Sequence, residues 1–245
     1  MLAPLIGTVK TVDDVVSTMQ AIDGTLPDTD GVKWFNLLYL SVTETVRGDR
    51  NQWEDWPFLS RFDVTFATLY FDAIVSWEQD RRNTPHAWRP LFKLRYARGR
   101  APIQFALAGM NAHINHDLAI ALDRMAAVER RFPSRDGARF RDFNRVNDVL
   151  ERTETVLRQK LATGLAGTID LALGDVDSAI AMWNVRQARE AAWTNGELLW
   201  HLRADPRLQR DYLAHLDQFA SFAGSGVLVP RLGVPADAGG PRLAE

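Results

Sequence analysis

Apolar residues recur every three or four positions along most of the chain, and runs that alternate apolar and polar residues are short. One stretch shows the spacing clearly, with apolar residues at Phe62, Phe66, Leu69, Ala73 and Trp77. Because an α-helix completes a turn in about 3.6 residues, this spacing places the apolar side chains on one helix face. The pattern therefore predicts an all-α protein.

Capping residues and helix breakers divide the chain into consecutive helical segments. Thr11 has the character of a helix N-cap, and Pro102 and Pro206 suit the first turn of a helix. The expected helices span about residues 11–24, 31–47, 59–78, 88–97, 102–130, 138–162, 165–173, 175–202 and 206–224. Since no repeat and no long polar linker separates them, we expect one helical domain, residues 1–223. A loose tail rich in Gly, Pro and Ala follows at residues 224–245.

The segment from about residue 101 to 130 is apolar on nearly all sides. A helix of this kind is normally buried at the centre of a bundle. We therefore expect a multi-helix bundle around it, with Leu107 and Leu118 inaccessible to solvent. Five polar residues interrupt the apolar character: Asn111, His113, Asn115, His116 and Asp117. An unpaired buried polar group costs about 1–3 kcal/mol, so this cluster requires an explanation.

Helical spacing separates the five polar residues into two sets. His113, His116 and Asp117 fall on one face, beside Gly109, which would leave room for a ligand. The two asparagines point the other way and could bond to neighbouring helices. The first set supplies two imidazoles and a carboxylate, which is a partial ligand set for zinc, iron or manganese. It serves equally as an acid/base group in which Asp117 orients an imidazole.

A buried polar network that fixes the packing of the helix is the competing interpretation of this cluster. Removing one member of such a network would leave its partners unpaired and destabilise the fold. Removing a member of a functional site would instead cost little stability and abolish activity or metal uptake. The spacing of the three residues does not decide between a functional site and a structural network, because it lacks the His-Glu-x-x-His order of zinc peptidases.

Other helices carry polar residues that could reach the same centre. Glu197 is a candidate fourth member of the catalytic group, and Asp63 shares a helix face with Tyr70. The candidate substrate-binding residues are Tyr70, Asn144, Asn147, Arg186, Arg189 and Trp193. These residues also have structural interpretations. The arginines could form surface ion pairs, the tryptophan could pack in the core, and the amides could bond to helix ends.

A basic block lies between Arg81 and Arg100 and contains no acidic residue. It could form a mouth for an anionic group, or a solvated face that acids elsewhere balance. Trp88, Phe92 and Tyr96 recur every four residues within it, which predicts that the aromatic side of the block faces inward.

Composition and charge narrow the classes of function. The chain has 245 residues, 46% of them hydrophobic, with a formal net charge of −2 and no cysteine. No overall basic field is present to hold nucleic acid, and the absence of cysteine excludes disulfides and thiolate catalysis. The sequence also lacks a run of about 20 apolar residues and a secretory signal pattern. We therefore expect a cytoplasmic protein without a membrane span.

Three further motifs accompany the string Asn-Ala-His-Ile-Asn-His-Asp-Leu at residues 111–118. They are Trp-Arg-Pro-Leu-Phe at 88–92, Asn-Arg-Val-Asn at 144–147 and Arg-Glu-Ala-Ala-Trp at 189–193. Together they resemble the domain-of-unknown-function family numbered 5995, found mainly in actinobacteria and fungi, over about residues 12–202. The resemblance brings no established activity, so it supports where the site lies rather than what it does.

The leading hypothesis is a small-molecule enzyme whose buried His113, His116 and Asp117 act with or without a divalent metal. Hydrolysis and rearrangement are both open to such a site. One alternative is a non-catalytic protein that holds an apolar ligand in an aromatic cavity. Another is a metal-free cyclase or lyase of an isoprenoid-like or polyketide-like substrate, and a third is a purely structural protein. The substrate and the oligomeric state stay open.

Overall fold

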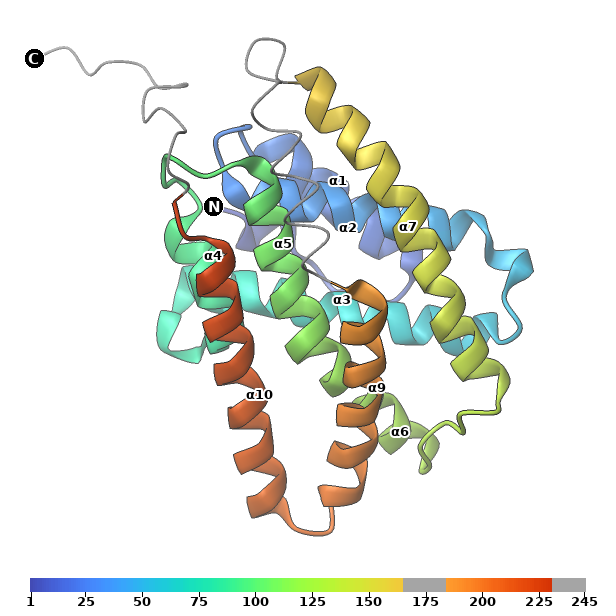
Figure 1. Ribbon diagram of the computed structural model, residues 1–245. Helices are drawn as coiled ribbons and strands as arrows, with labels where there is room; N and C mark the ends of the chain where they lie inside the picture. Colours follow the sequence, from blue (N-terminus) through green and yellow to red (C-terminus); the bar gives the residue numbers. More distant parts are fainter. Residues whose placement is uncertain (165–183, 231–245) are drawn as a thin grey trace, which may run out of the picture.

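The computed structural model describes residues 1–164 and 184–230, with side chains described outside residues 154–164 (Figure 1). Within these ranges the chain is all-helical and contains no strand. The α-helices are α1 (Val12–Thr25), α2 (Gly31–Gly48), α3 (Trp56–Gln79), α4 (Arg89–Leu94), α5 (Pro102–Ala112), α6 (Leu118–Glu129), α7 (Ala138–Gly164), α9 (Val185–Leu202) and α10 (Pro206–Val227). Short 3-10 turns lie at Ala3–Leu5, Arg50–Gln52, Arg81–Asn83 and His86–Trp88, and a π-helix lies at His113–Asp117.

The axis of the bundle is the column formed by α5, the π-helix and α6. Helix α5 packs between α2 and α10, while α6 packs mainly against α9 and also against α3. Helix α7 crosses α2 and α3, and α9 and α10 form a hairpin (Figure 1). The predicted all-α bundle around a central helix is therefore confirmed. None of the described helices combines the length and the apolar character that crossing a membrane requires.

Side-chain caps explain where several helices begin. Thr11 accepts a hydrogen bond from the backbone of Asp14, whose carboxylate accepts one from Thr11 in return, so the predicted capping box is present. Asp55 caps α3 by accepting from the backbone of Phe58, which starts that helix at Trp56 rather than near Leu59. The segment between the two predicted helices at 31–47 and 59–78 is thus partly helical.

Two other predicted boundaries differ from the structure. Helix α9 begins at Val185 with Asn184 as its cap, whereas the predicted start at Asp175 and the short helix at 165–173 lie outside the described residues. Helix α10 continues to Val227 instead of ending at Gly224. The reason is that the chain beyond Gly224 stays in contact with the bundle: Leu228 is buried, and its carbonyl accepts a hydrogen bond from Arg100 Nε.

The central helix is as buried as its sequence predicts. Leu118 has 0% of its surface exposed and Leu107 has 7%. Leu118→Ala is therefore expected to lower the free energy of unfolding by about 2–5 kcal/mol, because it removes a buried side chain and leaves a cavity. Urea denaturation measures this loss. Val128→Ala on α6 is the control, since Val128 is 75% exposed and its truncation should change stability by less than about 0.5 kcal/mol. Equal losses in both variants would contradict the central placement.

Candidate functional site

The polar cluster of the central helix coincides with the π-helix at His113–Asp117. In a π-helix each backbone N–H bonds to the carbonyl five residues earlier, so the turn is wider than an α-helical one. Such turns are rare, usually occur inside α-helices, and are frequent at functional sites. The predicted continuous helix from 102 to 130 is therefore interrupted at the residues that carry the candidate chemistry.

Asp117 is fully buried and is the centre of a hydrogen-bond network. Its Oδ2 accepts from Trp88 Nε1 at 3.0 Å and lies 3.0 Å from His113 Nδ1, while its Oδ1 lies 2.7 Å from His116 Nδ1. Burial alone would raise the pKa of Asp117, but the hydrogen bonds from the two histidines outweigh it and hold the pKa below its usual value. Asp117 is therefore a carboxylate that accepts from three donors.

The ionised Asp117 decides the tautomer of His113. A carboxylate oxygen can only accept, so Nδ1 of His113 carries the proton and Nε2 keeps a lone pair. Burial lowers the pKa of His113 despite the charge of Asp117, which keeps the imidazole neutral. The Nε2 atom is buried and has no hydrogen-bond partner among the residues that the structure describes. His113 is thus a neutral base with its basic nitrogen free.

His116 joins the network to helix α10. Its Nε2 lies 3.7 Å from Asp217 Oδ1. Asp217 in turn accepts from the backbone amides of His86 and Ala87 at 2.9 and 2.8 Å. Burial disfavours a charge on His116, but the hydrogen bond to Asp117 and the two carboxylate charges together raise its pKa. His116 therefore bridges two carboxylates, which is what the network interpretation predicts for it.

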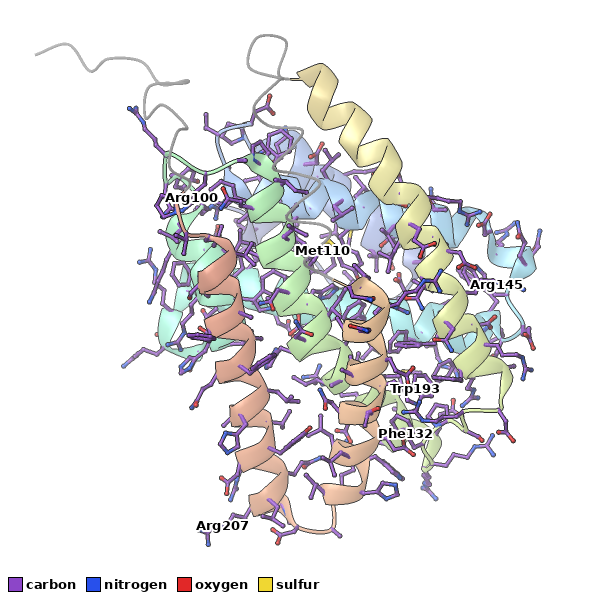
Figure 2. All side chains as sticks on the ribbon, in the orientation of Figure 1. Arg100, Met110, Phe132, Arg145, Trp193 and Arg207 are labelled. Carbon is purple, nitrogen blue, oxygen red and sulfur yellow. The ribbon has the colours of Figure 1, made fainter. Side chains whose placement is uncertain are left out.

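A cavity of about 70 Å³ opens on the other side of His113, between α2, α3, α5, the π-helix, α7 and α9. Its wall is mostly apolar and aromatic: the ring of Phe66 stacks on His113 at a centroid distance of 3.5 Å, and Met110 contributes from α5 (Figure 2). Four polar side chains also line it, namely Tyr39, Asp63, His113 and Arg189. An aromatic cavity of the kind that the ligand-binding alternative requires therefore lies next to His113.

The polar groups of this cavity are poorly compensated. Tyr39 Oη and Asp63 Oδ2 are buried without a hydrogen-bond partner in the described part of the chain. Burial raises the pKa of Asp63 to about 7, so this carboxyl group exchanges its proton near neutral pH. Buried polar groups are normally paired, and unpaired ones with perturbed pKa values concentrate at functional sites.

The three residues predicted to ligate a metal do not converge on a common point. The Nδ1 atoms of His113 and His116 both face Asp117, and their Nε2 atoms have different surroundings, the cavity wall and Asp217. Within residues 1–153 and 184–230, no three His, Cys, Asp or Glu side chains are placed to hold one metal ion. The side chains form a hydrogen-bonded triad instead of a shared ligand set.

Helix α9 places only one of its predicted site residues at the cavity, Arg189. Glu197 does not line the cavity, and its carboxylate lies 3.6 Å from Arg135 Nε on the outer side of the bundle, so the structure does not bring it to His113, His116 and Asp117. Arg186 is exposed and pairs with Asp148 and Glu151. Trp193 is fully buried but packs against Phe132, Phe140 and Phe143 in the core, as its structural interpretation predicts (Figure 2).

The other predicted binding residues also lie outside the cavity wall. Tyr70 is buried and donates from its hydroxyl to Asn36 at 3.4 Å. Asn144 is half-buried on α7, and Asn147 is buried with its Oδ1 unpartnered among the described residues. The room predicted beside Gly109 does not exist, because a Cβ atom there would collide with the ring of Phe35. The glycine allows close helix packing rather than ligand entry.

Asn111 bonds to a neighbouring helix as predicted, whereas Asn115 bonds to Asn111 within the central column. Asn111 donates from Nδ2 to the carbonyl of Ala220 on α10 at 2.6 Å. Asn115 donates to Oδ1 of Asn111 at 2.9 Å. These bonds attach α10 to the column, on the opposite side from the cavity.

Three cations of the basic block are engaged by other groups of the described structure. Arg95 is buried against Asp30, Arg82 pairs with Asp80, and Arg89 donates to backbone carbonyls. Tyr96 is exposed, so the prediction that it faces inward with Trp88 and Phe92 is wrong. The chain turns out of the helical repeat after Leu94, where α4 ends.

Sequence reasoning misses two residues of the site, Tyr39 and Trp88. Tyr39 lies on an apolar face of α2, where a tyrosine is expected to be core, and nothing local indicates that its hydroxyl lacks a partner. Residue spacing places Trp88 only in an aromatic stripe, although its indole nitrogen holds Asp117. Both roles depend on contacts between distant segments, which residue spacing cannot reveal.

The comparisons with known proteins agree with the resemblance carried by the motifs. No curated protein and no solved structure matches the chain. Residues 12–230 match a family described as a family of unknown function, DUF5995. This match covers most of the chain and includes the π-helix, the cavity and helices α9 and α10. The chain therefore belongs to the DUF5995 family.

Proposed function

We propose that the protein is an enzyme that transfers protons to and from a small, largely apolar substrate, with His113 as the general base. The observation that carries the proposal is the free Nε2 of His113 at the wall of an apolar cavity. Asp117 would hold the base in its active tautomer, as a carboxylate does for a catalytic imidazole. Isomerisation and elimination are the reaction classes that such a base serves.

Asp63 supports the proposal as the complementary acid. Its pKa of about 7 means that at neutral pH it is present in both protonation states, which suits a group that returns a proton to the substrate. A base and an acid with different environments in one cavity are typical of acid/base catalysis. Tyr39, whose hydroxyl also lacks a described partner, would orient the substrate by hydrogen bonding.

The second candidate function is non-catalytic binding of a small apolar ligand. The mostly aromatic lining of the cavity favours it, because such walls bind by burial of apolar surface alone. This alternative assigns no role to the free nitrogen of His113. The two functions therefore differ in what a change at His113 does.

Exchange of substrate hydrogen with solvent deuterium tests the proposal, and it does not require that the natural substrate be identified first. A panel of small carbonyl and unsaturated compounds is incubated with the protein in D2O, and exchange at carbon is followed by NMR. His113→Gln is expected to slow exchange at least about 100-fold, because general base catalysis contributes about 10²- to 10⁴-fold.

His201→Gln is the matched control for this experiment, since His201 is an exposed histidine of α9. It should leave the exchange rate unchanged. Compounds that bind the wild-type protein but never exchange would favour the binding alternative. Exchange that His113→Gln leaves intact would contradict the assignment of His113 as the base.

A further inference from the structure

Among the described residues that line the cavity, Arg189 is the one whose side chain is positively charged at neutral pH. It is 5% exposed. Its Nη2 donates to the carbonyl of Phe143 at 2.6 Å, and its guanidinium lies 4.2 Å from the centre of the Phe143 ring. These contacts with α7 hold the group in one orientation. They leave its positive charge without a negative partner.

Other arginines of the described structure differ from Arg189, because carboxylates balance their charges. Arg95 lies against the carboxylate of Asp30, and Arg186, one turn before Arg189, pairs with Asp148 and Glu151. No carboxylate within the described ranges pairs with Arg189, and its Nε has no hydrogen-bond partner there. A buried charge is costly unless it is paired, so a missing anion is the natural explanation.

Asp63 lines the same cavity but does not act as this anion. No ion pair joins it to Arg189 in the described structure, and burial raises the pKa of Asp63 and lowers that of Arg189. Burial lowers the pKa of Arg189 to about 9, which leaves it protonated at neutral pH. The two side chains therefore present separate recognition points to one ligand.

We propose that the ligand of this cavity is a small monocarboxylate whose carboxylate binds the free Nε edge of Arg189 and whose apolar body lies against the aromatic wall. This inference rests on the proposed function and specifies its substrate class. A planar carboxylate matches the fork of guanidinium donors. One positive charge calls for one negative charge, since a dianion such as phosphate would bring a second, unpaired charge into an apolar site.

The size of the cavity limits the apolar body. About 70 Å³ is less than the roughly 150 Å³ of a cavity known to hold benzene, so a ligand with no more non-hydrogen atoms than the six of benzene is expected. Butyrate is therefore the probe, with butyramide as its uncharged counterpart of nearly equal shape. Isothermal titration calorimetry at pH 7 compares the two ligands on the full-length wild-type protein.

Butyrate is expected to bind the wild-type protein at least about tenfold more tightly than butyramide, because only the carboxylate forms a charge-assisted bond. Arg189→Met should remove this preference, and Arg186→Met, an exposed arginine on the same helix, should retain it. Arg189→Lys keeps a positive charge and should keep part of the preference, which covers the case in which the methionine variant does not fold.

Three results would overturn the inference: equal affinity for butyrate and butyramide, unchanged butyrate affinity in a folded Arg189→Met variant, or displacement of butyrate by inorganic phosphate at similar concentration. The outcome is separate from that of the exchange experiment. If butyrate binding depends on Arg189 but no compound exchanges hydrogen with solvent, the carboxylate site is supported and the enzyme proposal is contradicted. If exchange depends on His113 but the protein does not prefer butyrate to butyramide, the enzyme proposal is supported and the carboxylate site is contradicted.

Discussion

Asp63→Asn is expected to stabilise the protein by about 4 kcal/mol at pH 8 and to have almost no effect at pH 3. Burial raises the pKa of Asp63 from 3.8 to about 7, and a tenfold change in proton affinity corresponds to about 1.4 kcal/mol. The folded protein therefore holds a proton that the unfolded chain releases above pH 4. The stability that this proton provides is complete below pH 4 and is lost as the pH rises through 7.

Urea denaturation of both proteins at several pH values between 4 and 8 measures this difference. The asparagine variant cannot ionise, so its advantage should grow steadily across that range and level off above pH 7. Asp211→Asn, at an exposed position of α10, is the control and should show no such growth. A constant difference between variant and wild type at all pH values would show that Asp63 ionises in the folded state as it does in the unfolded chain.

Asp117→Asn is expected to lower the free energy of unfolding by about 3–5 kcal/mol at pH 7. The carboxylate accepts from Trp88, His113 and His116, and an asparagine amide replaces one acceptor oxygen by a donor NH2 group. At least one of the three buried donors is then unpaired, and His116 loses the nearer of its two carboxylates. Loss of one partner of a buried charged pair costs about this much.

The same substitution should also change the state of His116. Trp88 Nε1 can only donate, and it shares Oδ2 with His113, so the amide oxygen would keep that position and the NH2 group would donate to His116 Nδ1, which moves the proton of that ring to Nε2. Nitrogen NMR of the histidine rings detects the change, since the two tautomers have different nitrogen shifts. Asp211→Asn again serves as the control. A variant that is as stable as wild type and keeps the same tautomer would mean that Asp117 does not organise this site.

The helical architecture was predictable because its causes are local. The repeat of apolar residues on α3 and the capping box at Thr11 are properties of neighbouring positions, and both are present. The burial of Leu118 followed from a helix that is apolar all round. The π-helix was not predictable, because the spacing of the five polar residues fits an α-helix as well.

The composition of the cavity depends on packing between helices that are distant in sequence. Arg186 and Arg189 are equivalent candidates in the sequence and lie one turn apart on α9, yet the first forms a solvent-exposed ion pair and the second is buried with its Nε unpartnered among the described residues. Glu197 shares a stripe with Arg189 but lies two turns further along α9, beyond the end of the cavity, where Arg135 binds it. Spacing identifies which residues share a face, but not how far along the face a cavity extends.

Because of the π-helix, the site depends on the number of residues in the central helix as well as on their identity. A π-turn contains one residue more than the α-helical turn it replaces. A relative with a single-residue deletion between 112 and 118 would regain regular α-helical bonding, because the wide turn accommodates that residue. The apolar residues of α6 would still face α9, but the side chains within the turn would change direction, which alters the hydrogen bonds that Asp117 makes. In a family alignment, a one-residue gap at this place would therefore mark members whose hydrogen-bond network differs here, even where every histidine remains.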